Sequence, residues 1–370
     1  METFSPFGIE QGRSEQERII RSIAYMAQHP RPEGSKHIAN VREELRSWLR
    51  GLGYPFVEQD VPCFKWSCLS GPSLTLSMGN THGENQVPIP CFPIIGSGST
   101  RLENNPYSAV YGKIGPRSKI ISVDQSEWVG LPILLKGKPS GCTIISRKDG
   151  TWPVGVTDHD HAYIGVNYEI LGILEAMKNH GKTIKVQVKT SLESIAAPNI
   201  IVGNRDAEML IVAHLDSFPG SPGAEDNASG VAALMKVLSD LGPDNYCVGF
   251  TCGEETGMHG ARALCEITNP KLVVCIDSVG IGELVVQTNM RDSLIIGYPH
   301  TFRADFGPYD LGEFTKNETP GVLITSRSPD GYYYPYAHRP TDTVGNINPD
   351  LVMQAAEVVK GIITSYPNLL

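Results

Sequence analysis

Apolar residues recur with two different periods along the chain, and the change of period divides it into three parts. Residues 14–53 carry apolar positions at helical spacing, with a Ser-x-x-Glu start at residue 14 and glycines at residues 51 and 53. A capping box at one end and C-terminal glycines at the other predict helical structure here. Residues 54–61, YPFVEQDV, then predict a strand.

The second part, residues 62–192, is rich in Pro and Gly and alternates short strand-like pieces with turns. SKIISVD (118–124) and GCTIISR (141–147) are such pieces, and the part closes with a predicted helix at 167–181 and a strand at 183–190. This composition predicts a separate β-rich module, inserted between the first strand and the remaining strands.

The third part alternates apolar strands with helices from residue 197 onwards. Strands are predicted at 199–204, 209–216, 246–252, 271–278 and 321–326, and helices at 229–242, 257–267 and 348–366. Strands that are apolar on both faces are typical of a sheet covered by helices on both sides. The predicted fold class is α/β, with a mostly parallel or mixed central sheet flanked by helices.

Composition narrows the possible partners and the compartment. The 370 residues are enough for two domains, and the net charge of −9 argues against a nucleic-acid or anionic-membrane partner. The N-terminal residues lack an apolar core of signal-peptide length, and no run approaches the ~20 apolar residues of a membrane span. We therefore expect a cytoplasmic protein, whose oligomeric state cannot be read from the sequence. The eight cysteines show no CxxC spacing, which favours core thiols.

Ionisable residues gather where the predicted strands of the third part end. Ligand sites in open α/β sheets form outside the carboxyl ends of the strands, and buried ionisable groups are costly unless they are paired or metal-bound. Each residue alone has an ordinary explanation, such as a helix cap for Asp226 or favourable first-turn charges for Glu254 and Glu255. Mixed histidine and carboxylate ligands together suit zinc. The candidates are His214, Asp216, Asp226, Glu254, Glu255, Asp277 and His338, with Glu225 beside Asp226.

Five segments carrying these residues resemble a known family. AHLDS, SPGAEDNASG, GEETGMHGARAL, CIDSVG and HRPTDT occur in the order found in di-zinc aminopeptidases of the M28 type. The resemblance covers residues 14–60 and 193–370, so that 1–61 and 193–370 would form the zinc peptidase domain. The insertion at 62–192 is similar to a protease-associated (PA) domain, from YGKIGPRSKIISVD through GCTIISRKDG to YIGVNYEILGIL.

The resemblance implies a role for each candidate. It places His214 and Asp277 on one zinc ion and Glu255 and His338 on a second, with Asp226 bridging both. Glu254 would be the general base. Asp216 would orient the imidazole of His214, and Asp342 would serve similarly elsewhere in the site.

The implied activity is removal of the N-terminal residue from peptides or aminoacyl amides by a metallo-aminopeptidase. One alternative is an amidohydrolase or a glutaminyl-cyclase-like acyl transferase that acts on a small molecule with a single zinc. Another is a non-catalytic, peptidase-like binding protein, which should show a broken ligand set. The number of bound ions separates the two enzymatic hypotheses.

The segment RADFGPYDLGEF departs from the family pattern. Tyr309-Asp310 stands where Ser-Asp is expected, and Phe306 stands near the place of a tyrosine. These three residues and Phe314 are the candidate substrate-binding residues, with the two phenylalanines expected to line an apolar pocket.

Two further polar or aromatic runs receive structural interpretations. We interpret TDHDHAY (157–163), with His159 and His161, as a polar turn rather than a second metal site. For GYYYPY (331–336) a packed loop is favoured over a specificity wall, although the run lies close to His338.

Overall fold

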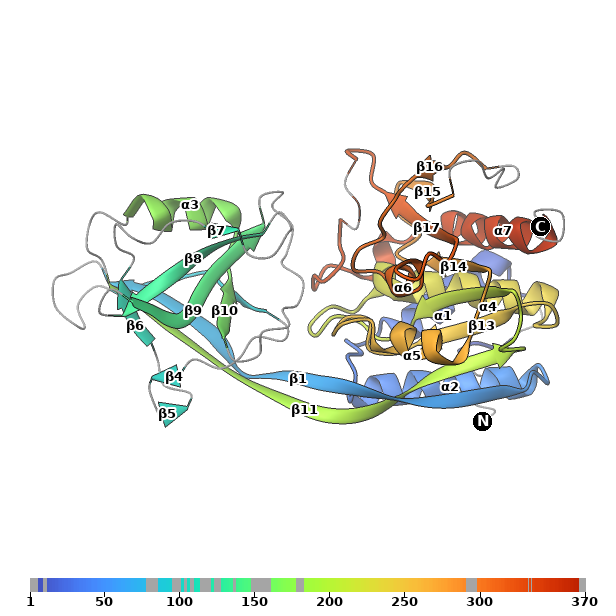
Figure 1. Ribbon diagram of the computed structural model, residues 1–370, viewed down its shortest axis with the longest axis horizontal. Coiled ribbons are helices and arrows are strands. Elements are labelled where there is room, and N and C mark those ends of the chain that lie inside the picture. The colour runs from blue at the N-terminus through green and yellow to red at the C-terminus, as the bar shows by residue number, and fades with distance from the viewer. Residues whose placement is uncertain are drawn as a thin grey trace. The chain divides into compact units, whose positions relative to one another are not determined.

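The computed structural model divides into two compact units, Met1–Phe64 with Ser194–Leu370, and Lys65–Glu193 (Figure 1). The chain passes from one unit to the other within two long paired strands, β1 (Phe56–Ser77) and β11 (Thr183–Gly203). That the second unit is a PA domain stays a prediction. The structure describes residues 6–8, 12–77, 86–94, 101–102, 105–106, 110–113, 121–122, 128–135, 138–147, 161–177, 183–290, 298–331, 333 and 335–365.

The first unit is built on a mixed sheet, which confirms the predicted fold class. Its strands lie in the order β16-β15-β17-β14-β12-β13-β11. Neighbours β13, β12, β14 and β17 are parallel to one another. β11 runs antiparallel to β13, and β15 runs antiparallel to β17 and parallel to β16. The strands are β12 (Met209–His214), β13 (Cys247–Thr251), β14 (Leu272–Ile276), β15 (Glu283–Thr288), β16 (Thr301–Phe302) and β17 (Gly321–Arg327).

Helices cover both faces of this sheet because successive side chains of a strand point to opposite faces. Ile211 and Ala213 of β12 belong to one core, with residues of α1, α2, α4 and α7. Leu210 and Val212 belong to a second core, with residues of α5 and α6. The helices are α1 (Glu15–Met26), α2 (Lys36–Gly51), α4 (Gly230–Leu241), α5 (His259–Ile267), α6 (Asp310–Thr315) and α7 (Pro349–Ser365).

The predicted ends of the first two helices are confirmed. The Ser14 hydroxyl accepts the Glu17 N–H at 3.2 Å, while the Glu17 carboxylate accepts the Ser14 N–H at 2.9 Å, which completes the capping box. After α2, Gly53 adopts φ +72°, and the Tyr54 N–H donates to the Leu49 carbonyl at 3.0 Å. This left-handed glycine ends the helix as expected.

The second unit has its own apolar core, formed by strands and one helix. Leu131, Ile144, Ile164 and Leu171 are all fully buried in it. Its elements are β2 (Gln86–Ile89), β3 (Phe92–Pro93), β4 (Arg101–Leu102), β5 (Asn105–Pro106), β6 (Val110–Lys113), β7 (Ile121–Ser122), β8 (Trp128–Leu135), β9 (Lys138–Arg147), β10 (Ala162–Gly165) and α3 (Tyr168–Ala176).

Two expectations from composition can be compared with the structure. All eight cysteines are free, and Cys247, Cys252 and Cys275 are buried, which confirms them as core thiols. In the described part of the chain, no helix combines the length and apolarity needed to cross a membrane.

Candidate metal centre

Three neighbouring parallel strands deliver the candidate residues to one edge of the sheet. β12 ends at His214, which pairs with Thr251 at the end of β13. Glu254 and Glu255 follow β13, and Asp277 follows β14 directly. Because the carboxyl ends of parallel strands meet at one edge, residues far apart in sequence come together there.

Two loops complete the cluster. An irregular turn, Ala224–Ser229, leads into α4 and carries Asp226. The segment between β17 and α7 carries His338. The potential ligand atoms form two groups, His214 with Asp226 and Asp277, and Asp226 with Glu255 and His338, each within 4.8 Å. Asp226 belongs to both groups.

The two carboxylate oxygens of Asp226 face different histidines. Oδ1 lies 3.1 Å from His214 Nε2, and Oδ2 lies 3.2 Å from His338 Nε2. Asp277 Oδ2 lies 3.8 Å from His214 Nε2, and Glu255 Oε2 lies 3.0 Å from His338 Nε2. One carboxylate is therefore shared between two sets of potential ligands.

The charges of the cluster require cations. Burial raises the pKa of Glu255 to about 7, since a charged carboxylate is poorly solvated there. Burial alone would lower the pKa values of His214 and His338, but the surrounding carboxylates outweigh it and hold both well above their ordinary values. A buried cluster with this many carboxylates therefore favours bound cations.

Buried atoms at the centre that lack a well-directed hydrogen bond also fit a metal. His214 Nε2 and both carboxylate oxygens of Glu255 form no hydrogen bond with any described residue, although His214 Nε2 lies 3.1 Å from Asp226 Oδ1 and Glu255 Oε2 lies 3.0 Å from His338 Nε2. Buried polar atoms are seldom left unpaired, because desolvation then goes uncompensated. Imidazole nitrogen and carboxylate oxygen are common zinc ligands.

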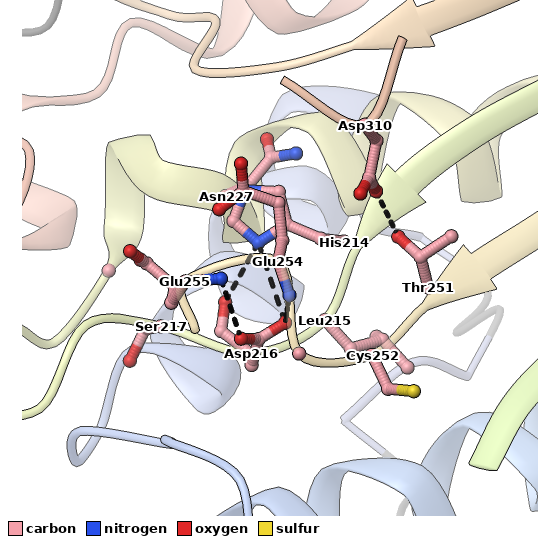
Figure 2. Close-up of polar contacts among 12 residues, drawn as sticks. His214, Leu215, Asp216, Ser217, Asn227, Thr251, Cys252, Glu254, Glu255 and Asp310 are labelled. Atoms are coloured by element: carbon pink, nitrogen blue, oxygen red, sulfur yellow. Dashed lines mark hydrogen bonds and ion pairs between the residues drawn. The ribbon is translucent and has the colours of Figure 1, made fainter. Parts of the chain in front are cut away.

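Asp216 makes contacts that differ from those expected of it. The His214 Nδ1–H donates to the backbone carbonyl of Asp216 at 3.1 Å, while the nearest carboxylate oxygen is 3.8 Å away. That carboxylate instead accepts the N–H groups of Glu254 and Glu255, at 3.2 Å each (Figure 2). The carbonyl orients the imidazole and leaves Nε2 for a metal, and the carboxylate positions both glutamates.

Glu254 is half-buried and belongs to neither ligand group. Burial raises its pKa well above the ordinary value, and the neighbouring carboxylates of Glu255, Asp277 and Asp310 raise it further. A carboxylate with a raised pKa beside a group of potential metal ligands is a candidate general base. Asp342 accepts the N–H groups of Glu225 and Asp226 at 2.6 and 3.2 Å, and so fixes the turn that carries Asp226.

The expectation that Phe306 and Phe314 line an open pocket is wrong in this structure. Their side chains are 0% and 2% exposed and pack in the core beneath α5 and α6. Tyr309 packs against the same core, under the guanidinium of Arg303 at 5.1 Å. The aromatic residues of this segment therefore belong to the core and do not line a substrate pocket.

Asp310 is the member of this segment that faces the polar cluster. It is fully buried, and its Oδ2 accepts the Thr251 hydroxyl at 2.5 Å (Figure 2). Its Oδ1 forms no hydrogen bond with any described residue, and burial raises its pKa to about 7. Asp310 therefore keeps a free polar atom beside the candidate centre.

The structure describes only some residues of the TDHDHAY and GYYYPY runs. His161 lies 2.8 Å from the Thr143 hydroxyl and contacts the ring of Tyr163, as in a packed turn. His159 lies outside the described residues. Of the GYYYPY run, Tyr332 and Tyr334 also lie outside them, and Tyr333 and Tyr336 are half-buried.

Arg31 fixes a loop next to the candidate site, and no motif in the sequence indicated this role. Its fully buried guanidinium donates to four backbone carbonyls, those of Met26, Leu215, Pro222 and Gly223, at 2.6–3.3 Å. Three of these belong to the loop between His214 and Asp226. A single side chain thus holds that loop against the end of α1.

Replacing Arg31 with Met should lower the free energy of unfolding by about 3 kcal/mol, because several buried carbonyls lose their donors. Urea unfolding followed by circular dichroism measures this. Arg18→Met, at a partly exposed position on α1, is the control and should change stability by less than about 0.5 kcal/mol. Equal effects of the two substitutions would show that other contacts hold the loop.

The chain is similar to several known proteins. Residues 199–363 match the model of Peptidase family M28. A probable leucine aminopeptidase of Arthroderma otae is 24% identical over 229 residues, 52% of this chain and 62% of that protein. A probable lipoprotein aminopeptidase of Mycobacterium tuberculosis is 34% identical over 90 residues, 22% of this chain and 18% of that protein. The chain thus spans less than two thirds of these curated relatives.

Solved structures share the fold over nearly the whole chain. An aminopeptidase from Aneurinibacillus sp. strain AM-1 superposes with a TM-score of 0.68 at 18% identity, covering 95% of this chain and 93% of that one. A zinc aminopeptidase from Bacillus subtilis gives a TM-score of 0.65 at 16% identity, covering 97% and 96%.

Proposed function

We propose that the chain, whose residues 199–363 match the model of Peptidase family M28, is a zinc-dependent aminopeptidase that releases the N-terminal residue of peptides or aminoacyl amides. The observation that carries this proposal is the sharing of Asp226 between two histidine-carboxylate groups. The aminopeptidases among its relatives support it.

In this proposal His214 and Asp277 would hold one zinc ion, Glu255 and His338 would hold the other, and Asp226 would contribute to both. When bound, such ions acidify a water molecule and stabilise negative charge on oxygen. Asp216 holds Glu254 and Glu255 side by side through their backbone N–H groups. This arrangement would allow Glu255 to bind metal while Glu254 accepts and donates protons.

Glu254 would accept the proton of the attacking water and deliver it to the leaving amine. A general base works best when its pKa lies near the working pH, and burial moves the pKa of Glu254 in that direction. Peptides are the expected substrates, and the identity of the preferred first residue is open to measurement.

We expect two equivalents of zinc per chain in protein purified without chelator. Elemental analysis measures the metal, and a panel of aminoacyl amides and blocked peptides assayed on the same sample measures activity. Chelation should abolish activity, and zinc should restore it. A fully active preparation holding one equivalent would instead support the cyclase-like alternative.

A further inference from the structure

Glu225 is a buried carboxyl group beside the bridging residue, and neither ligand group includes it. Its side chain is 0% exposed. Oε2 accepts the backbone N–H of Tyr336 at 3.1 Å, and Oε1 forms no hydrogen bond with any described residue. The carboxyl group therefore links the loop that carries Asp226 to the loop that carries His338.

His338 belongs to no helix or strand that could hold it. It lies in a turn in which the Arg339 N–H donates to the Tyr336 carbonyl at 3.1 Å, and its own φ is +62°. A histidine in the left-handed region is uncommon and needs support from its surroundings. Tyr336 and Arg339 therefore close the turn that carries His338.

A second residue of the segment that carries Glu225 also contacts this turn. The ring of Phe218 stacks on the imidazole of His338, with centroids 4.5 Å apart and planes inclined by 16°. Phe218 and Glu225 both belong to the segment between β12 and α4, which Arg31 and Asp342 also hold. The orientation of His338 therefore depends on a segment that is itself firmly fixed.

We propose that Glu225 is a positioning residue, which holds the Tyr336–Arg339 turn so that His338 Nε2 faces Oδ2 of Asp226. The proposal rests on the proposed zinc centre, because His338 is expected to bind there. Replacing a residue that orients a metal ligand without binding the metal itself typically lowers metal affinity by about 10–100-fold.

The test is a titration of metal-free protein with Zn²⁺ against a chromophoric chelator. Glu225→Leu removes the acceptor and should weaken one of the two equivalents by about 10-fold or more, leaving the other unchanged. Glu225→Gln keeps a carbonyl oxygen for the Tyr336 N–H and should bind both ions like the wild type. If Glu225→Leu does not fold, Glu225→Ala provides the same comparison.

A double-mutant cycle separates positioning from a general loss of structure. In a His338→Ala background, Glu225→Leu should weaken zinc binding no further, because the ligand that it positions is gone. In a His214→Ala background, its effect on the remaining ion should persist. A structural defect would weaken binding in both backgrounds.

Two outcomes would overturn the proposal, and they can be distinguished from failure of the proposed function. Wild-type affinities for both ions in Glu225→Leu, or equal losses in the two backgrounds, would refute the role of Glu225 alone. A wild-type protein that binds no zinc would refute the zinc centre itself and this inference with it.

Discussion

Replacing Glu254 with Gln should reduce kcat by about 10²–10⁴-fold, the usual contribution of a positioned general base, while both zinc ions stay bound. Gln has nearly the shape of Glu but cannot take a proton from water. Glu254 lies outside both ligand groups, so its loss should leave the metal content unchanged. Steady-state kinetics and elemental analysis on one preparation measure both quantities.

Glu255→Gln is the matched control, because the two residues are adjacent and share the same anchor on Asp216. Glu255 Oε2 lies 3.0 Å from His338 Nε2, so this substitution should lower metal occupancy. If Glu254→Gln lost zinc and stayed active, the assignment of the two glutamates would be reversed.

A peptide with a free amino terminus should be cleaved, and the same peptide N-acetylated should be cleaved about 10⁴-fold more slowly, the penalty typical of leaving buried polar partners unpaired. The site is rich in carboxylates, and Asp310 Oδ1 is buried without a hydrogen bond to any described residue. Anionic surroundings favour a protonated amine over a carboxylate. Mass spectrometry of the products identifies the bond that is cut.

The matched control for this experiment is the same free-amine peptide with its carboxyl terminus amidated. A carboxyl terminus would need an Arg or Lys clamp, and Arg262 instead pairs with Glu313 at 3.2 Å. Amidation should therefore leave cleavage unchanged. Comparable cleavage of the acetylated peptide would favour an amidohydrolase that acts on small molecules.

The edge of the sheet could be predicted because its residues follow apolar runs directly. His214 ends β12 and Asp277 follows β14 directly, and the apolar, two-sided character of both strands predicts that they belong to a buried, mostly parallel sheet. Asp226 and His338 lie in loops. The prediction that they come together rested on the resemblance of their motifs to a known family, because loops have no periodic pattern.

Contacts between loops could not be predicted from the sequence pattern. The bond from Tyr336 to Glu225 joins segments distant in the chain, and neither has a periodic pattern. Phe306 and Phe314 were misplaced for a related reason: an apolar residue near a site signals burial, without indicating which face of the sheet buries it.

The discontinuity of the first unit has a consequence for its synthesis. The apolar faces of α1 and α2 share one core with α4 and α7, so these two helices are synthesised well before part of the surface that covers them. At about 5–20 residues per second, roughly 15–60 s separate the end of α2 at Gly51 from the start of α7 at Pro349. During that interval Lys65–Glu193 can complete a core from its own residues. Part of this core thus stays uncovered, and available to chaperones, until α7 has been synthesised.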